Sequence, residues 1–242
     1  MIATVECRMT SSRLPGKVFM NAGGKPLLQI LVERLRRVPQ LDDIVLATTV
    51  NKTDDCIIEL AQEMGCKYYR GSENDVLRRV LEAARSDKAD IIVEITGDCP
   101  LIDPELISKT IDLYLKSGCD YCSNDLPLTY PAGMDTQVFS TDLLALADKK
   151  GLTEPDREHV SHYFIQRPKE FKLLNLAAPR ELHWPELRLT LDERADYDLI
   201  KTIHEHFSRK GDEYPSLAKI IEHLKENIHL VDINKHVQPK TI

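Results

Sequence analysis

The sequence predicts a three-layer α/β fold with a mostly parallel central sheet. Short apolar runs alternate with amphipathic stretches four times between residues 2 and 116, and this alternation is typical of strand–helix–strand units. The run at residues 44–48 is a continuous apolar run, which is typical of a central parallel strand covered by helices on both faces. Both observations favour parallel strands between two layers of helices.

The first half of the chain gives the clearest elements. We expect strands at residues 2–5, 44–48, 67–69 and 90–95. The helices between them are expected at about 25–38, 53–64, 76–86 and 104–116, each with apolar residues at helical spacing. Gly65 ends the second helix, and Ser72 is the expected N-cap of the third.

The second half is less regular. We expect a loop at 129–135, a strand at 136–139, a helix at 141–149 and a helix that carries Glu158, His159 and His162. Two further strands are expected near 171–176 and 187–191, and two helices at 194–208 and 216–226. No repeat or linker divides the chain, so we expect a single domain over residues 1–242.

Composition excludes several classes of protein. A hydrophobic content of 42% and a charged content of 29% are those of an ordinary globular protein. A net charge of −7 argues against a nucleic-acid or membrane-surface binder. No apolar run approaches the roughly 20 residues of a membrane span, and the start lacks a signal-peptide pattern, so we expect a cytoplasmic protein. Its six cysteines are then reduced, including the Cys119-x-x-Cys122 pair.

The segment from residue 6 to residue 17 carries the strongest chemical pattern. It follows the first strand directly and holds three cations, Arg8, Arg13 and Lys17, with small hydroxyl residues such as Ser11 among them. Cations and exposed amide groups on a strand-to-helix loop fit a polyphosphate, and open α/β sheets bind ligands beyond the carboxyl ends of their strands. The alternative is a solvated basic surface loop.

Asp98 is a second candidate. It comes just after the strand at 90–95, so its carboxylate is expected at the carboxyl edge of the sheet, where a Mg²⁺ ion bridging phosphate oxygens would be held. A turn or a helix cap is the alternative role for a Gly-Asp pair at this place.

These residues also carry a resemblance to a known family. The pattern Arg8-x-x-Ser11-x-Arg13-x-x-x-Lys17, with the string Ser-Arg-Leu-Pro-Gly-Lys at 12–17, resembles the N-terminal signature of the sugar cytidylyltransferases. This group includes the CMP-Kdo synthetases, the acylneuraminate cytidylyltransferases and the spore-coat polysaccharide F-type proteins. The segment Thr-Gly-Asp-Cys-Pro at 96–100 is similar to their metal loop. Glu6 departs from the family pattern, where Gln or Pro is usual.

The resemblance covers about residues 1–200 and implies a nucleotide-diphospho-sugar transferase-like, Rossmann-like fold. It implies a nucleotide-binding half at about 1–120, an acceptor-binding and dimerisation half at about 121–210, and a C-terminal helical tail at about 211–242. By position, the expected nucleotide-binding residues are Arg8, Ser11, Arg13, Lys17, Arg70, Ser72 and Arg78. The expected acceptor-binding residues are Tyr130, Asp135, Gln137, Glu158 and His159.

The implied activity is a Mg²⁺-dependent cytidylyl transfer. CMP moves from CTP to a sugar or sugar acid for surface or spore-coat polysaccharide synthesis, and pyrophosphate is released. The resemblance gives catalytic roles to Arg8, Lys17 and Asp98, and makes Asp98 and Asp192 the Mg²⁺ ligands; Asp192 is also a possible N-cap of the following helix. A homodimer is implied as well.

Two alternatives stay open. A GT-A-type glycosyltransferase would share the sheet and would need an Asp-x-Asp metal motif, for which Asp196-Tyr197-Asp198 and Asp54-Asp55 are the nearest strings. A non-catalytic nucleotide-binding protein on the same scaffold is the other alternative, with Glu6 as its only hint. A zinc site at His159 and His162 lacks a third ligand at a recognisable spacing.

Overall fold

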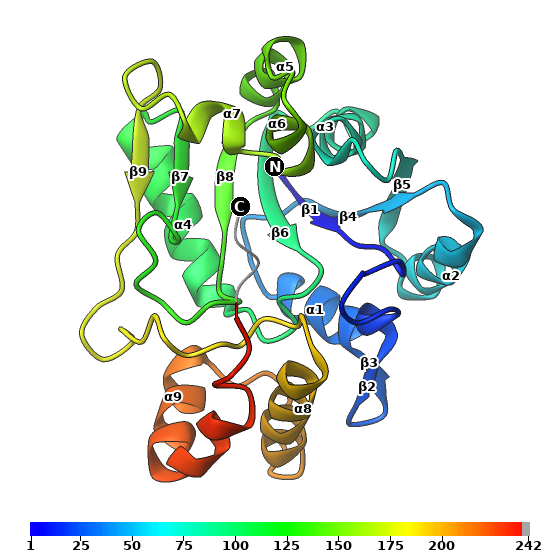
Figure 1. Ribbon diagram of the computed structural model, residues 1–242. Coiled ribbons are helices and arrows are strands. Elements are labelled where there is room, and N and C mark those ends of the chain that lie inside the picture. Colours follow the sequence, from blue (N-terminus) through cyan, green and yellow to red (C-terminus); the bar gives the residue numbers. More distant parts are fainter. Residues whose placement is uncertain (239–242) are drawn as a thin grey trace.

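A seven-stranded sheet in the order β5-β4-β1-β6-β8-β7-β9 forms the centre of the molecule (Figure 1). The structure, a computed structural model, describes residues 1–238. Strands β1 (Ile2–Glu6), β4 (Asp43–Thr49), β5 (Lys67–Gly71) and β6 (Ile91–Thr96) run parallel. Strand β8 (Gln137–Ser140) is antiparallel to β6 and β7 (Tyr121–Ser123), and β7 pairs in parallel with β9 (Leu173–Asn175). The predicted fold class is confirmed.

The register brings the carboxyl ends of the central strands together. Glu6, at the end of β1, pairs with Ala47 of β4 and with Thr96 of β6. The segments that leave these strands therefore begin at one edge of the sheet, as expected for an open α/β sheet.

Helices cover both faces of the sheet. One apolar cluster joins β1, β4 and β6 to α1 (Leu27–Leu35), α2 (Asp55–Met64) and α4 (Pro104–Ser117). A second cluster joins the opposite face to α3 (Val76–Ser86), α5 (Thr141–Lys150) and α7 (His162–Ile165), and the short α6 (Glu154–Glu158) lies beside them at the top of Figure 1. Sheet and helices thus make the three layers.

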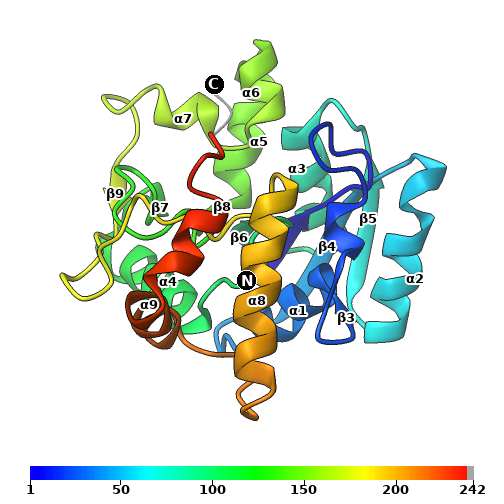
Figure 2. The same cartoon turned by 60° about the horizontal axis from the view of Figure 1, so that its bottom comes forward.

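A third apolar cluster packs against α1 and α4 and includes their residues Leu27, Ile30 and Leu106. It contains α8 (Arg194–Ser208) and α9 (Leu217–Glu226) together with buried residues of the segments 130–134 and 187–191. The 3-10 turn η3 (Ile228–Ile233) follows α9, and Figure 2 shows it in front of the sheet. Residues 239–242, the end of the tail expected at about 211–242, lie outside the described part of the chain.

Several predicted elements differ from the structure. The first helix begins at Leu27, because Lys25 and Pro26 form strand β3 and pair with β2 (Asn21–Ala22) across a turn at Gly23 and Gly24. Before this hairpin the loop contains a 3-10 turn, η1 (Lys17–Phe19), and a second one, η2 (Lys52–Asp54), precedes α2. The segment 187–191 is not a strand; it makes one isolated bridge, Ala132 with Arg188. Strand β7 was not predicted.

Two helix predictions were wrong in detail. The N-cap of α3 is Asp75, whose side chain accepts the Arg78 amide hydrogen, whereas Ser72 accepts the amide hydrogen of Asp75. The helix expected around Glu158 is divided into α6 and α7, with His159 in an extended conformation between them. His159 and His162 therefore do not share one helix face. Within residues 1–238, no helix combines the length and apolar character needed to cross a membrane.

Candidate active site

The loop that leaves β1 is held in place by backbone contacts. The amide of Gly16 donates to the carbonyl of Met9 at 2.8 Å, which closes the loop. The amide of Met9 donates to the buried carboxylate of Asp54 at 2.8 Å, and Asp54 also accepts the hydroxyls of Thr48 and Thr49 at 3.1 and 2.6 Å. The cation-bearing loop is thus fastened to the end of the neighbouring strand β4.

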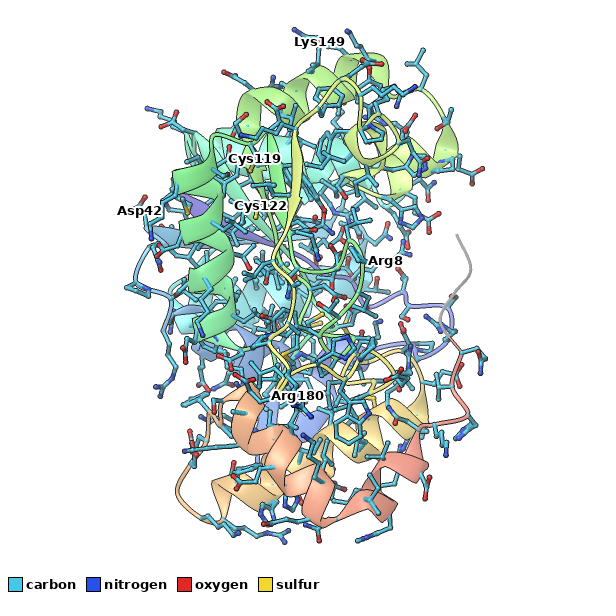
Figure 3. The ribbon with its side chains drawn as sticks, turned by 90° about the vertical axis from the view of Figure 1, so that its left-hand side faces the viewer. Arg8, Asp42, Cys119, Cys122, Lys149 and Arg180 are labelled. Atoms are coloured by element: carbon cyan, nitrogen blue, oxygen red, sulfur yellow. The ribbon has the colours of Figure 1, made fainter. Side chains whose placement is uncertain are left out.

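A pocket of about 260 Å³ opens beside this loop at the carboxyl edge of the sheet. Arg8 lies on the opposite side of the molecule from Asp42, which precedes β4 at the other edge (Figure 3). The pocket contains most of the predicted charged residues. Its lining includes Arg8, Ser11, Arg13, Lys17, Asp98, Glu158, His159 and Asp192.

Lys17 lies between two carboxylates in this pocket. Its Nζ is 2.9 Å from Asp98 Oδ2 and 3.3 Å from Asp192 Oδ1, and it donates to the carbonyl of Leu191 at 2.7 Å. The Lys17 side chain is 12% exposed. The structure therefore brings together the two predicted metal ligands and one predicted phosphate-binding cation.

The charges of this cluster stabilise one another. Burial alone would lower the pKa of Lys17, but the charges of Asp98 and Asp192 raise it above its usual value. Burial alone would raise the pKa of Asp98, but the Lys17 ammonium holds it below the usual range. Both groups are thus ionised at neutral pH.

Two arginines also hold Asp192. Arg13 contacts Asp192 Oδ1 at 2.7 Å, and Arg188 contacts Oδ2 at 3.0 Å. The α8 cap is Glu193, which forms a capping box with Asp196. Asp192 is therefore not the helix cap, and its carboxylate faces the cations of the pocket.

Gly97 sets the position of Asp98. Its amide donates to the carbonyl of Glu6 at 2.9 Å, and a Cβ at this position would lie 2.9 Å from both that oxygen and the Cβ of Cys7. Only a residue without a side chain allows the ends of β1 and β6 to approach this closely.

Gly133 sets the position of Asp192 in a similar way. Its φ is +95°, and a Cβ would lie 2.5 Å from the carbonyl carbon of Leu189. The contact holds the segment 187–191 against the loop around Ala132, to which Leu189 donates at 2.8 Å. The amide of Leu191 then donates to the carbonyl of Asp98 at 2.8 Å, so both carboxylates are fixed relative to each other.

Arg79 is a pocket residue that the sequence reasoning missed. It is 4% exposed, donates to the carbonyl of Ala47 at 3.2 Å and lines the pocket beside Glu6. Burial raises the pKa of Glu6 to about 7 against the opposing charge of Arg79. The helical spacing could have predicted that Arg79 is buried. It lies three residues after Val76 and four before Ala83, and both of these residues are buried on the same helix face.

Glu73 is a second missed residue. Its carboxylate contacts Arg8 at 3.1 Å, accepts the hydroxyl of Thr10 and accepts from the side-chain amide of Asn51 at 2.7 Å. Glu73 thus links the loop after β5 to the cation-bearing loop. No local pattern predicts this contact, because Arg8 and Glu73 are 65 residues apart in the chain.

Three predicted nucleotide-binding residues lie outside the pocket. Arg70 contacts Asp55 at 2.8 Å. It also donates to the carbonyl of Thr49 at 2.9 Å and to the carbonyl of Asn51 at 2.8 Å. Ser72 and Arg78 line a smaller pocket of about 170 Å³, which shares Arg79 with the larger one.

Asp75 pairs with an arginine of another helix rather than with Arg78 of its own. The Asp75 carboxylate accepts the backbone amide of Arg78 and pairs with Arg157 of α6 at 2.6 Å. This contact fastens α6, and with it Glu158 and His159, to the start of α3.

The predicted acceptor-binding residues are divided by the structure. Glu158 and His159 line the main pocket. Tyr130 does not, because it is 2% exposed within the apolar cluster of α8 and α9. Asp135 and Gln137 have buried side-chain oxygens near β8 for which residues 1–238 supply no hydrogen-bond partner.

The aspartates considered for a glycosyltransferase metal motif make structural contacts instead. Asp54 is buried and fastens the loop after β1. Asp196 is buried, completes the capping box of α8 with Glu193 and pairs with Arg188 at 3.4 Å. Among residues 1–238, no group of three or more His, Cys, Asp or Glu residues could hold a metal ion by itself. Cys119 and Cys122 are free, buried thiols (Figure 3).

Comparison with known proteins gives concordant results. The family model described as Cytidylyltransferase matches residues 2–233. The spore coat polysaccharide biosynthesis protein SpsF of Bacillus subtilis is 33% identical over 228 residues, covering 92% of this chain and 93% of that protein. An uncharacterized protein of Methanocaldococcus jannaschii is 36% identical, covering 100% of this chain and 97% of its own length.

A solved structure agrees along the whole chain. It is that of a cytidylyltransferase from Leptospira borgpetersenii, with a TM-score of 0.89 and 32% identity. The match covers 100% of this chain and 98% of that one.

Proposed function

The chain belongs to the cytidylyltransferase family, and we propose that it moves CMP from CTP to a hydroxyl group of a sugar or sugar acid, with release of pyrophosphate. We further propose that the product serves surface or spore-coat polysaccharide synthesis. The observation that carries the proposal is the single pocket at the carboxyl edge of the sheet in which Arg8, Arg13 and Lys17 meet Asp98 and Asp192.

The three cations fit a triphosphate. Each is held by a protein carboxylate, Arg8 by Glu73, Arg13 by Asp192 and Lys17 by Asp98. A triphosphate provides equivalent oxygens at high charge, so it can replace these partners and keep the three cations paired, and Asp98 and Asp192 are then available to another cation. The cations are thus preorganised for the nucleotide before it arrives.

The two carboxylates fit a Mg²⁺ ion. Asp98 and Asp192 converge on one ammonium nitrogen, so their oxygens already share a cation. Mg²⁺ prefers one or two carboxylates and completes its shell with water and substrate phosphates, and two carboxylates are what this pocket offers. The bound ion would neutralise charge on the phosphate oxygens. We therefore propose that Asp98 and Asp192 hold it.

The transfer needs positioning and charge stabilisation more than covalent help. The acceptor's hydroxyl oxygen forms a bond to the α-phosphorus of CTP while the bond from that phosphorus to the α–β bridging oxygen breaks. The electron pair of that bond leaves with pyrophosphate, and the hydroxyl proton passes to solvent. Arg8, Arg13 and Lys17 would stabilise the charge that grows on the leaving group.

A nucleotide-binding experiment tests the proposal directly. Calorimetric titration of CTP, UTP, ATP and GTP in Mg²⁺ is expected to show binding of CTP, weakened at least tenfold in Arg13→Met. Arg167→Met is the matched control, because Arg167 packs on the ring of Tyr163 at 3.9 Å and does not line the pocket. Failure of all four nucleotides to bind would overturn the proposal.

We also propose a cytoplasmic homodimer, on the resemblance to relatives that form dimers. Light scattering is expected to give twice the chain mass of 27.6 kDa. A mass of one chain at assay concentration would contradict this.

A further inference from the structure

The end of the described chain returns to the candidate active site. After η3, residues 234–238 lead from the level of α8 and α9 toward the sheet, as the red segment of Figure 1 shows. Asn234 is 2% exposed and Val237 is 4% exposed, and the amide of Val237 donates to the carbonyl of Asn234 at 3.0 Å. The segment is therefore a turn that is anchored in the molecule at two positions. We call residues 234–238 the C-terminal turn.

Asn234 binds two acceptors that lie close to Asp192 in the chain. Its side-chain nitrogen Nδ2 donates to Oδ1 of Asp196 at 2.8 Å and to the backbone carbonyl of Arg188 at 3.1 Å. A backbone carbonyl and an ionised carboxylate can only accept hydrogen bonds, so a donor is needed between them. The amide group of Asn234 supplies two N–H groups, one for each acceptor.

The carboxylate of Asp196 connects Asn234 to the backbone of Asp192. Its other oxygen, Oδ2, accepts the backbone amides of Asp192 and Glu193, both at 3.0 Å. Asp196 is 0% exposed, so a lost partner is not replaced by bulk water. Arg188 Nε also contacts Oδ1, but at a longer distance of 3.4 Å. Asn234 therefore makes the shorter of these two contacts, which together fix the rotation of the carboxylate.

The C-terminal turn also contacts both arginines that hold Asp192. Arg188 contacts Asp192 Oδ2 at 3.0 Å, and its backbone carbonyl accepts from Asn234. Arg13 contacts Asp192 Oδ1 at 2.7 Å and donates to the carbonyl of Gln238 at 3.4 Å. Each oxygen of the Asp192 carboxylate is thus held by an arginine that the turn contacts.

The direction of the Asp192 carboxylate decides how well it can share a cation with Asp98. Both carboxylates line the pocket, and Asp192 lies 3.3 Å from Lys17 Nζ. Mg²⁺ requires near-ideal octahedral geometry, so a small rotation of one carboxylate weakens its binding. Hydrogen bonds behind a ligand side chain commonly fix this orientation, and their loss typically costs about 10–100-fold in metal affinity. The contacts of the C-terminal turn are of this kind.

We propose that Asn234 is a positioning residue, which acts through Asp196 and Arg188 to aim the Asp192 carboxylate at the metal position of the pocket. This inference rests on the proposed function and adds the C-terminal turn to the parts of the chain that the transfer requires. Asn234 does not line the pocket, so its effect on metal binding is exerted through these neighbours.

Replacement of Asn234 by Leu tests the proposal, because Leu has a similar branched shape and lacks both donors. Asn227→Leu is the matched control. Asn227 lies at the other end of η3, and its side-chain nitrogen also contacts two groups, the carbonyl of His223 at 2.9 Å and His223 Nδ1 at 3.2 Å. It does not line the pocket. The two variants therefore remove similar contacts, of which only those of Asn234 lead to Asp192.

Thermal melting with CTP across a series of Mg²⁺ concentrations measures metal binding without turnover. The Mg²⁺ concentration that gives half of the Mg²⁺-dependent rise in melting temperature is expected to be at least about tenfold higher in Asn234→Leu than in the wild type. Asn227→Leu is expected to keep the wild-type midpoint, even where its melting temperature is lower at every Mg²⁺ concentration. A purely structural role of Asn234 would produce only such a constant offset.

The outcomes separate this inference from the proposed function. An unchanged Mg²⁺ midpoint in Asn234→Leu overturns the inference, as does an equal shift in Asn227→Leu. If Asn234→Leu does not fold, Asn234→Ser, which keeps one donor, is measured in its place against the same two criteria. Stabilisation of the wild type by CTP that does not depend on Mg²⁺ also overturns the inference and leaves nucleotide binding intact, whereas failure of the wild type to bind any nucleotide overturns the proposed function itself.

Discussion

Replacement of Lys17 by Met tests how the two pocket carboxylates are held. The change removes the ammonium that lies 2.9 Å from Asp98 and 3.3 Å from Asp192 and keeps most of the side-chain volume. Without Mg²⁺ the two carboxylates then repel each other across the pocket, although Asp192 keeps its contacts with Arg13 and Arg188.

The size of the effect follows from the contacts. Three charge-assisted hydrogen bonds are lost, to Asp98, Asp192 and the carbonyl of Leu191, each worth about 1.5–3 kcal/mol. Relaxation toward solvent and relief of the cost of burying the ammonium recover much of this. We expect a loss of roughly 2–4 kcal/mol in the free energy of unfolding. For a chain of this size, that corresponds to a melting temperature lower by roughly 5–15 °C.

Thermal melting with and without Mg²⁺ measures both parts of the prediction. Mg²⁺ is expected to raise the melting temperature of Lys17→Met more than that of the wild type, because the variant's carboxylates lack their ammonium. Lys25→Met is the matched control. Lys25 also contacts two carboxylates, Glu33 at 2.9 Å and Glu213 at 3.1 Å, but lies outside the pocket.

Two results would refute this reasoning. A Lys17→Met protein as stable as the wild type would show that the ammonium does not stabilise the carboxylates. An equal Mg²⁺ response in Lys17→Met, Lys25→Met and the wild type would show that Asp98 and Asp192 do not hold the ion.

Four further changes are expected to act through contacts of the site. Asp98→Asn should reduce turnover at least about 100-fold with an unchanged circular dichroism spectrum; near-normal activity in Mg²⁺ would contradict the metal assignment. Glu6 has a pKa of about 7 in the folded protein against a usual 4.5, so its contribution to stability, complete below pH 4.5, is lost as the pH rises through 7. Glu6→Gln should therefore raise the melting temperature more at pH 8 than at pH 5, and an equal change at both would count against it. Gly97→Ala should cost about 1–3 kcal/mol in urea unfolding and slow turnover, because its Cβ meets Cys7 and the Glu6 carbonyl at 2.9 Å; wild-type stability would show that β1 and β6 can separate freely. Arg188→Met should cost about 3–5 kcal/mol, since it leaves the fully buried Asp196 without its cation, and a change below 1 kcal/mol in the same assay would be inconsistent with that role.

The first half of the fold could be predicted because its signals are local. Strands β1, β4 and β6 are covered on both faces and are therefore mostly apolar, and α3 and α4 carry regular apolar stripes. The second half depends on contacts that are distant in sequence. The short β7 forms because β8 and β9 pair with it on either side, and three residues carry too little pattern to be recognised.

The site residues that lie on one loop or directly follow one strand could be predicted from the sequence. Lys17, Asp98 and Asp192 were each predicted from their neighbours along the chain. The contact of both carboxylates with Lys17 Nζ was not, because it depends on the register of β1 with β6 and on Gly133. The pairing of Thr4 with Glu94 and of Glu94 with Gln137 was not predictable, because these residues become adjacent only when β1, β6 and β8 pair.

Pyrophosphate release from CTP in Mg²⁺, measured across a panel of sugars, is the most direct test of the proposed activity. We predict release with CTP and one class of sugar or sugar acid, and loss of that release in Asp98→Asn and Lys17→Met but not in Lys25→Met. No release with any sugar from a protein that binds CTP, or equal release by Asp98→Asn, would contradict the assignment of this pocket as a cytidylyl transfer site.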